Sequence, residues 1–305
     1  MSNPKQARSS YYESSARARI AGLLEPDSFD EWLSAAERVT SPHLATLEQP
    51  VAFDDGVIIG QGSIAGKKIF IAAQEGGFMG GAVGEVHGAK IVGMLERAVR
   101  EHPAAVLLLL ETGGVRLQEA NAGLIAVSEV MRAILGARAA GVPVIVAIGG
   151  QYGCFGGMGI AARCATTIIM SEEGRLGLSG PEVIETARGV EEYDSRDRAL
   201  VWRTVGGKHR YLLGECDLIV PDSIEAFQGA ITACIDNGDN LTLATLEQEH
   251  QLLAERVQRF GACKDGSDVW RKLGWSDPDA IAMMDNDEFV KAAQGHRAKQ
   301  TTGAR

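Results

Sequence analysis

Residues 104–120, AAVLLLLETGGVRLQEA, and residues 142–159, VPVIVAIGGQYGCFGGMG, share one pattern, an apolar run that ends in glycine pairs. An uninterrupted apolar run of this length, bounded by glycine, is typical of a β-strand that is buried on both faces. Glycines at the end of such a strand let backbone N–H groups point at a ligand, because no side chain stands in the way. The two stretches therefore predict buried strands of one sheet, each followed by a turn that can hold an anion.

The glycine pairs in these turns are the strongest candidates for catalytic groups. Gly113 and Gly114 follow the first strand, and Gly156 and Gly157 lie in the loop after the second. Two backbone N–H donors around one oxygen form an oxyanion hole, which stabilises an anion that develops during a reaction. A single glycine pair is equally consistent with a tight turn that binds nothing. Two such turns after neighbouring strands favour an enzyme.

The composition excludes several classes of protein. The 305 residues are 45% hydrophobic and 23% charged, which is typical of a globular protein. The net charge of −10 argues against nonspecific binding to nucleic acid or to an anionic membrane. No apolar stretch approaches the roughly 20 residues that span a bilayer, and the N-terminal segment lacks the apolar core of a secretory signal. These features predict a soluble, cytoplasmic protein with neither a nucleic-acid nor a membrane partner.

Known signatures for metal and nucleotide chemistry are missing from the sequence. The five cysteines contain no C-x-x-C pair, so no zinc ribbon is encoded, and reduced thiols placed mostly in the core are expected. The sequence also lacks an H-E-x-x-H motif, a G-x-S-x-G elbow, a P-loop and a G-x-G-x-x-G fingerprint. We therefore expect no metal site and no covalent nucleophile on this chain.

The rest of the pattern predicts one α/β domain over residues 27–305, preceded by a polar tail over residues 1–26. The tail is rich in Ser, Ala and Arg and is expected to be poorly ordered or docked on a partner. Apolar spacings of three and four predict a helix from about residue 117 to 140, and strand, helix, strand is a right-handed parallel unit. A hairpin is predicted over residues 57–73, with further helices over residues 29–39, 85–100, 157–163, 223–236 and 241–260.

Few side chains in the glycine turns have an obvious chemical role. Tyr152 follows the second strand and can donate a proton or orient a carboxylate, although packing alone explains it slightly better. Cys154 lies in the same loop with nothing to activate its thiol, so a core position is expected. Arg116 follows the first glycine pair, and it either fixes that loop by salt bridges or contacts the substrate.

These motifs, taken in order, resemble the carboxyltransferase β half of acetyl-CoA carboxylase. The similarity covers roughly residues 50–225 and rests on residues 60–62 (GQG), 78–81 (FMGG), 113–120 (GGVRLQEA) and 177–185 (GLSGPEVIE). It implies a crotonase-like (ClpP/crotonase) fold of repeated ββα units, here with a helical C-terminal part, and paired oxyanion holes for acyl thioesters. Gly80, Gly81 and Arg116 are then candidates to contact the arm that bears the thioester.

The chain differs from the carboxylase β subunits in one feature, and this difference indicates a narrower group of relatives. Bacterial carboxylase β subunits usually carry an N-terminal zinc ribbon of four cysteines, but the first 150 residues of this chain contain no cysteine. The sequence, its length and the loop from Gly149 to Gly159 are most similar to the β subunits of biotin-independent malonate decarboxylases. That resemblance implies three partners: a γ-type carboxyltransferase-like subunit, an acyl-transferase subunit and an acyl carrier protein with a phosphoribosyl-dephospho-CoA arm. It implies no covalently bound cofactor on this chain.

The resemblance also implies a reaction, the decarboxylation of a malonyl thioester on the carrier protein to the acetyl thioester. The N–H groups of Gly113 or Gly114, with one from Gly156 or Gly157, would hold the thioester oxygen as negative charge grows on it. Each such donor is worth about 3–4 kcal/mol of barrier. The proton donor to the enolate stays open between water, Tyr152 and a residue of a partner chain.

Other functions stay open at this point. The same fold and oxyanion holes would serve transfer of the carboxyl group from a malonyl thioester to a biotin carrier protein. The chain is alternatively a non-catalytic docking subunit for the carrier protein. An enoyl-CoA hydratase needs a pair of catalytic carboxylates, and Glu111 has no convincing second carboxylate near the loop from Gly153 to Gly157.

Overall fold

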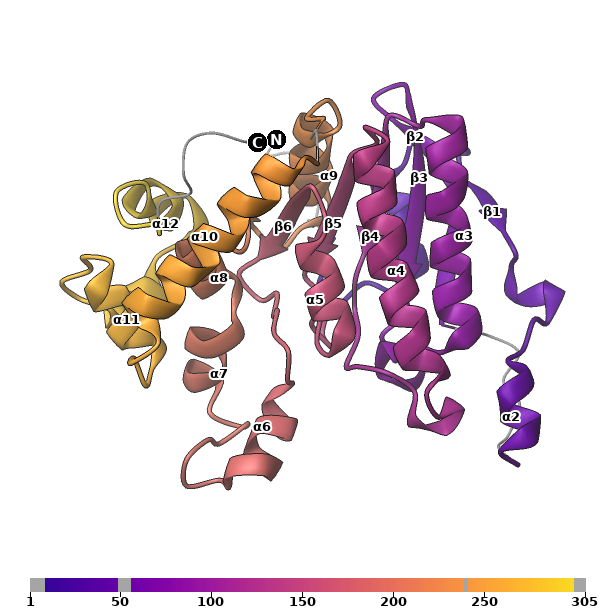
Figure 1. The fold of residues 1–305 in the computed structure, drawn as a ribbon. Coiled ribbons are helices and arrows are strands. Elements are labelled where there is room, and N and C mark those ends of the chain that lie inside the picture. Colours follow the sequence, from indigo (N-terminus) through magenta and orange to yellow (C-terminus); the bar gives the residue numbers. More distant parts are fainter. Residues whose placement is uncertain (1–8, 49–55, 239–240, 299–305) are drawn as a thin grey trace, which may run out of the picture.

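The computed structural model describes residues 9–48, 56–238 and 241–298 of the chain. Within these residues seven strands form one sheet, in the order β1-β2-β3-β4-β5-β6-β7 (Figure 1). The first two pairings, β1 with β2 and β2 with β3, are antiparallel, and all later pairings are parallel. The strands are β1 (Asp30–Trp32), β2 (Val57–Ile64), β3 (Lys67–Gln74), β4 (Ala105–Leu109), β5 (Val144–Ile148), β6 (Thr167–Ser171) and β7 (Leu218–Val220).

Helices cover both faces of this sheet. α3, α4 and α5 lie side by side over one face, and α1 and α9 pack on the other (Figure 1). The α-helices are α1 (Ala16–Leu23), α2 (Pro42–Thr46), α3 (Glu85–Glu101), α4 (Ala122–Ala139), α5 (Gly157–Arg163), α6 (Pro181–Arg188), α7 (Arg198–Val205), α8 (Gly207–Leu213), α9 (Ile224–Cys234), α10 (Leu243–Phe260), α11 (Gly266–Lys272) and α12 (Asn286–Ala293). Short 3₁₀ helices are η1 (Ala35–Glu37), η2 (Met79–Gly81), η3 (Leu117–Glu119) and η4 (Asp279–Met283).

The two apolar runs form neighbouring central strands, as predicted. β4 and β5 pair in parallel with Val106 opposite Val144. Successive residues of β4 point to opposite faces, so Val106 and Leu108 belong to the cluster under α3 and α4, whereas Leu107 and Leu109 belong to the cluster under α1 and α9. Because both faces are covered by helices, every position of these strands is apolar.

A second, short ribbon forms beyond the carboxyl ends of the parallel strands. Isolated parallel bridges join the loops that follow them: Val83 with Val115, Thr112 with Cys154, and Cys154 with Leu176. One repeat of the chain is thus a long strand, a short ribbon segment and a helix, as in β4, residues 112–115 and α4. This arrangement is the ββα unit that the sequence predicts, and it gathers the glycine turns at one edge of the sheet.

Residues 9–26 differ from the predicted polar tail. α1 lies within them, and Tyr11, Ile20 and Leu23 are buried in the apolar cluster shared with β3 and α9. The Tyr12 N–H donates to the Asp222 carboxylate at 2.8 Å, which fastens this segment to the loop before α9. The prediction of a poorly ordered or partner-docked segment is therefore corrected for residues 9–26, and residues 1–8 lie outside the described residues.

Residues 29–39 form β1 and η1 in place of the predicted helix. β1 pairs with the edge of β2. Trp32 packs edge-on against Phe70, with 4.8 Å between ring centroids, and the Arg97 guanidinium lies 4.1 Å from the Trp32 ring centroid. Pairing with the sheet edge and burial of the indole outweigh the local helical spacing.

The remaining helices extend the fold past β6 and β7. α8 and α12 contact β7, and α10 lies in front of α8 (Figure 1), where its Glu249 pairs with Arg163 of α5 at 3.1 Å. The hairpin β2–β3 and the helices α3, α5, α9 and α10 match their predictions to within a few residues, and α4 begins after η3. Within the described residues, no helix has the length and apolar character needed to cross a membrane.

Candidate active site

The two glycine turns meet beyond the ends of β4 and β5. The Thr112 N–H donates to the Gly153 carbonyl at 2.8 Å, and the Phe155 N–H donates to the Thr112 carbonyl at 2.9 Å. This pairing brings Gly156 so close to Gly114 that a Cβ added at Gly156 would lie 3.0 Å from the Gly114 Cα. The structure therefore places the two predicted glycine pairs side by side.

Two of the four predicted N–H donors are bonded to backbone carbonyls of the chain. The Gly113 N–H donates to the Gly80 carbonyl at 2.9 Å, and the Gly156 N–H donates to the Leu178 carbonyl at 2.9 Å. These backbone hydrogen bonds tie the turns to the loops after β3 and β6. Gly113 and Gly156 therefore shape the site, and their N–H groups are poorly suited to hold a substrate oxygen.

The other two N–H groups are more accessible to a ligand. The Gly114 N–H donates to the Thr112 hydroxyl oxygen at 3.1 Å, and no backbone carbonyl of the described residues accepts it. The Gly157 N–H, in the first turn of α5, has no hydrogen-bond partner in the described part of the chain. Gly156 has φ +66° and ψ −147°, a conformation open essentially to glycine alone, and this bend leads into Gly157 at the point where Gly156 lies against Gly114.

Gly80 and Gly81 support this site from the loop after β3. Both have left-handed backbone angles, with φ of +65° and +68°. A Cβ on Gly81 would stand 1.9 Å from the Glu111 carbonyl oxygen, so only glycine fits there. Their visible role is close backbone packing, and their predicted contact with the thioester arm stays a prediction.

Arg116 is a buried support of the loop after β4. Its guanidinium pairs with Glu119 at 3.0 Å and donates through Nε to the Ala82 carbonyl at 3.1 Å. Glu119 in turn accepts the Glu85 N–H, at the start of α3, at 2.6 Å. Of the two roles weighed for Arg116, the structure favours the salt bridge that fixes the loop, because only 5% of the side chain is exposed.

Tyr152 lies against the loop after β3. Its ring faces Gly76 and Gly80: added Cβ atoms there would lie 2.5 and 3.9 Å from its ring carbons. The side chain is 44% exposed, and its hydroxyl has no hydrogen bond among the described residues. Tyr152 is therefore accessible to a ligand, and its role as proton donor stays a prediction.

Sequence reasoning missed a buried ion pair that braces the site. Arg19 of α1 donates to the Glu111 carboxylate and, through Nε, to the Tyr11 carbonyl at 2.9 Å. The other Glu111 oxygen accepts the Tyr152 N–H at 3.1 Å. The available signal was Glu111 itself, because a carboxylate that directly follows a buried strand needs a buried cation. Since Glu111 is committed to Arg19, it is a poor general acid or base, which further disfavours a hydratase.

Other sequence expectations about reactive groups concern cysteine and metal. Burial raises the pKa of the Cys154 thiol, so it is an inert core residue, as expected. Within residues 9–48, 56–238 and 241–298, no group of three or more His, Cys, Asp or Glu side chains is placed to hold a metal ion.

Exposed apolar side chains occur on the segments that follow the glycine turns and on the loop and helix after β6, and we call them the apolar rim. Leu178 is 66% exposed although its carbonyl accepts the Gly156 N–H, and Leu117 is 84% exposed just after the first turn. Large apolar side chains gathered at one site are typical of a surface that another chain covers. The apolar rim consists of Leu117, Leu124, Ile125, Ile160, Leu178 and Val183.

Comparison with known proteins agrees with this geometry. The carboxyl transferase domain family matches residues 13–233, which is more than half of the chain. A malonyl-S-ACP:biotin-protein carboxyltransferase chain from Malonomonas rubra is 41% identical and is aligned over 95% of this chain and 96% of its own. The acetyl-CoA carboxylase carboxyl transferase subunit beta of Fusobacterium nucleatum is 35% identical over 57% of this chain and 59% of its own.

A solved structure is similar over most of its length. A chain of a Pseudomonas malonate decarboxylase hetero-tetramer, crystallised with malonate, superposes with a TM-score of 0.79 at 39% identity, over 87% of this chain and 98% of that chain. The crotonase-like fold implied by the motifs is confirmed by this likeness and by the ββα repeats. The chain therefore belongs to the carboxyl transferase domain family, and it is similar over 95% of its length to a malonyl-S-ACP:biotin-protein carboxyltransferase chain and over 87% to a chain of a malonate decarboxylase.

Proposed function

We propose that this chain is the subunit of a malonate decarboxylase that decarboxylates a malonyl thioester on an acyl carrier protein. The bond between the carboxyl carbon and Cα breaks, CO2 leaves, and the electron pair passes into the thioester enolate. A proton then adds to Cα and gives the acetyl thioester. The observation that carries this proposal is the close approach of Gly156, the residue before Gly157, to Gly114, in a chain that superposes over 87% of its length on a malonate decarboxylase chain.

We assign the oxyanion role to the N–H groups of Gly114 and Gly157. The enolate is the high-energy species, and its charge sits on the thioester oxygen. Fixed backbone donors stabilise such an oxygen without reorganisation, and each one is worth about 3–4 kcal/mol of barrier. Gly113 and Gly156 were also predicted as donors, but their N–H groups are bonded inside the chain, so we propose that they shape the two turns instead.

The partners in this proposal follow from the apolar rim and from the relatives. The malonate decarboxylase that resembles this chain is a hetero-tetramer, and the similar M. rubra chain acts on a malonyl group carried by an acyl carrier protein, as its name states. We propose that a γ-type carboxyltransferase-like subunit covers the apolar rim. A carrier protein would deliver the thioester on a phosphoribosyl-dephospho-CoA arm, after loading by an acyl-transferase subunit.

The decisive experiment removes one N–H with little change of shape. Gly157 is the first helical residue of α5, a position where proline is well tolerated. A Cβ there would stand 2.6 Å from Val127 Cγ1, so both test chains carry Val127→Ala to make room. Gly157→Ala keeps the N–H, and Gly157→Pro removes it. In the assembled complex, we expect the proline chain to lose about 100-fold or more in turnover relative to the alanine chain. Equal turnover of the two chains rejects the oxyanion role of Gly157.

A second candidate function is transfer of the carboxyl group to a biotin carrier protein. The relative at 41% identity carries that activity in its name, so this alternative has a specific observation behind it. Avidin separates the two functions, because it sequesters biotin. Decarboxylation that continues at an unchanged rate in excess avidin supports the biotin-independent reaction, and inhibition supports the transferase.

A further inference from the structure

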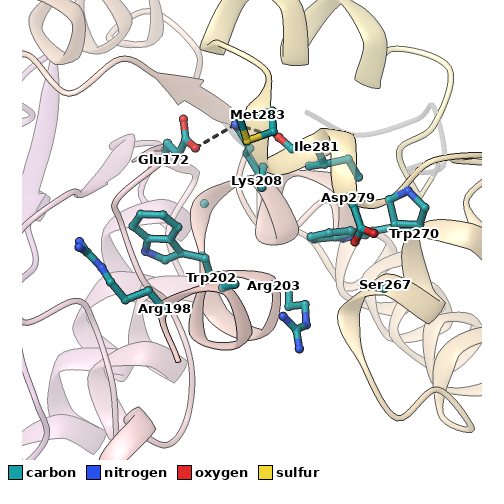
Figure 2. A pocket seen from close by; sticks show the side chains of 15 residues that line it. Glu172, Arg198, Trp202, Arg203, Lys208, Ser267, Trp270, Asp279, Ile281 and Met283 are labelled. Atoms are coloured by element: carbon teal, nitrogen blue, oxygen red, sulfur yellow. Dashed lines mark hydrogen bonds and ion pairs between the residues drawn. The ribbon is translucent and has the colours of Figure 1, made fainter. Parts of the chain in front are cut away.

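A cavity of about 510 Å³ lies away from the glycine turns, between α7 and α8 on one side and α11 and η4 on the other (Figure 2). Its volume is in the range of pockets that bind small organic molecules. Figure 2 shows Trp202 and Trp270 on either side of the space. Gly206, which lines the cavity, pairs with Arg175 at the edge of the short ribbon.

Lys208, which lines the cavity, uses all of its hydrogen-bond donors within the chain. Lys208 donates to the Ile281 carbonyl at 3.0 Å and to the Met284 carbonyl at 2.7 Å, and it pairs with Glu172 at 2.9 Å. These three acceptors use all three N–H donors of the ammonium group. Lys208 therefore fastens η4 to α8, and it has no donor left for a ligand.

One aromatic wall is fixed in orientation. The Trp270 indole N–H donates to His209 Nδ1 at 3.0 Å, which requires that nitrogen to be unprotonated. Burial of His209, with a smaller effect of Arg210, lowers its pKa to about 3, so this acceptor persists at neutral pH. The second wall, Trp202, is 37% exposed on α7 and offers its indole to the cavity.

Two charged side chains that line the cavity form no salt bridge with the described residues and can therefore pair with a ligand. Arg203 pairs with Asp265 at 2.8 Å, as Lys208 pairs with Glu172. Arg198 lies 5.2 Å from the Trp202 ring centroid, and neither it nor Asp279 has a salt-bridge partner among the described residues. Figure 2 shows Arg198 beside Trp202 and Asp279 beside Trp270. The cavity thus presents a cation and a carboxylate, one next to each aromatic wall.

We infer that this cavity binds an aminopurine nucleotide. The base stacks on the Trp202 indole, an interaction worth about 1–3 kcal/mol. The exocyclic amine donates to the Asp279 carboxylate, and the phosphate pairs with the Arg198 guanidinium. The inference goes beyond the proposed function, since none of these residues takes part in the oxyanion site. The nucleotide is either free or the nucleotide part of a larger thioester carrier.

The test measures binding by calorimetry to the full-length chain, with AMP as the probe. Adenosine lacks the phosphate and IMP lacks the amine, so each is expected to bind about tenfold more weakly than AMP. Trp202→Leu is expected to weaken AMP about tenfold or more. Arg198→Gln should reduce AMP to the affinity of adenosine while it leaves adenosine unchanged. Arg196→Gln, on the loop before α7 and outside the cavity, is the matched control and should bind AMP like the wild type.

Competition with dephospho-CoA separates the two sources of nucleotide. If dephospho-CoA displaces AMP and needs Trp202, the site accepts the nucleotide end of a thiol-bearing carrier. If AMP binds and dephospho-CoA does not displace it, the site takes a free nucleotide, and the inference still holds. Absence of measurable AMP binding by the wild type, or equal affinity in the wild type and Trp202→Leu, overturns it. Neither result depends on turnover, so failure here leaves the proposed decarboxylase function untouched.

Discussion

Single glycines in the active-site turns have different tolerances, although the sequence presents them as equivalent pairs. Gly156 has a positive φ, and a Cβ there would press on the Gly114 backbone at 3.0 Å. A Cβ on Gly113 would meet only the Gly80 carbonyl oxygen, at 3.4 Å, and Gly113 has no left-handed φ. The position of a glycine within its turn therefore decides whether an alanine in its place would disturb the active site.

We predict that Gly156→Ala lowers the turnover of the complex strongly and that Gly113→Ala hardly changes it. The first substitution costs about 1–3 kcal/mol in backbone strain and displaces Gly114, so turnover should fall at least tenfold. The second keeps the Gly113 N–H on the Gly80 carbonyl, and turnover should stay within about twofold of the wild type. Steady-state assays of the two complexes check this, with thermal melting as the control for folding. Equal losses in both would contradict the distinction.

The ion pair of Arg19 and Glu111 gives a stability prediction at the same scale. Arg19→Met leaves the Glu111 carboxylate buried without its cation, which is expected to cost about 3–5 kcal/mol of unfolding free energy. Arg17, two residues earlier on the same helix, pairs with Glu31 at the surface. Arg17→Met is therefore the matched control, expected to cost less than about 1 kcal/mol. Urea unfolding of both chains measures the difference, and similar costs would show that the buried pair contributes little.

Elements with a clear period were predictable from the sequence, and elements that depend on a distant partner were not. β4, β5 and α3 each contain their own signal, because burial on both faces or on one stripe dictates the spacing of apolar residues. α1 is only eight residues long, and it buries Arg19, so it looks polar in sequence. β1 is three residues long and exists through pairing with β2. Local spacing cannot reveal either contact.

The packing of α8 against α11 makes stability depend on pH. The folded chain keeps His209 neutral down to about pH 3, because burial lowers its pKa, whereas the unfolded chain takes up a proton near pH 6.5. Stability from this group is present above pH 6.5 and is lost as the pH falls, by about 1.4 kcal/mol per pH unit. We expect the difference in unfolding free energy between wild type and His209→Asn to shrink from pH 7 to pH 5. A difference independent of pH would exclude this linkage.

At the scale of the whole molecule, the sequence predicted the gathering of the glycine turns but not the donors within them. Strand order followed from consecutive parallel units, and it placed both turns at one edge of the sheet. Which N–H groups are occupied depends on Gly80 and Leu178, in the loops after β3 and β6. The assignment to Gly114 and Gly157 therefore needed the full arrangement of four loops.

The apolar rim yields the last prediction, which concerns assembly. Ile125 lies on the first turn of α4 and is 63% exposed, so Ile125→Asp is expected to change the stability of the isolated chain by about 0.5 kcal/mol or less. In a complex the same carboxylate would be buried without a partner, so co-purification with a γ-type subunit should fall at least tenfold. Leu243→Asp on α10 is the control, because Leu243 is as exposed but lies outside the apolar rim. Loss of assembly in both variants, or in neither, would mean that the partner covers a different face.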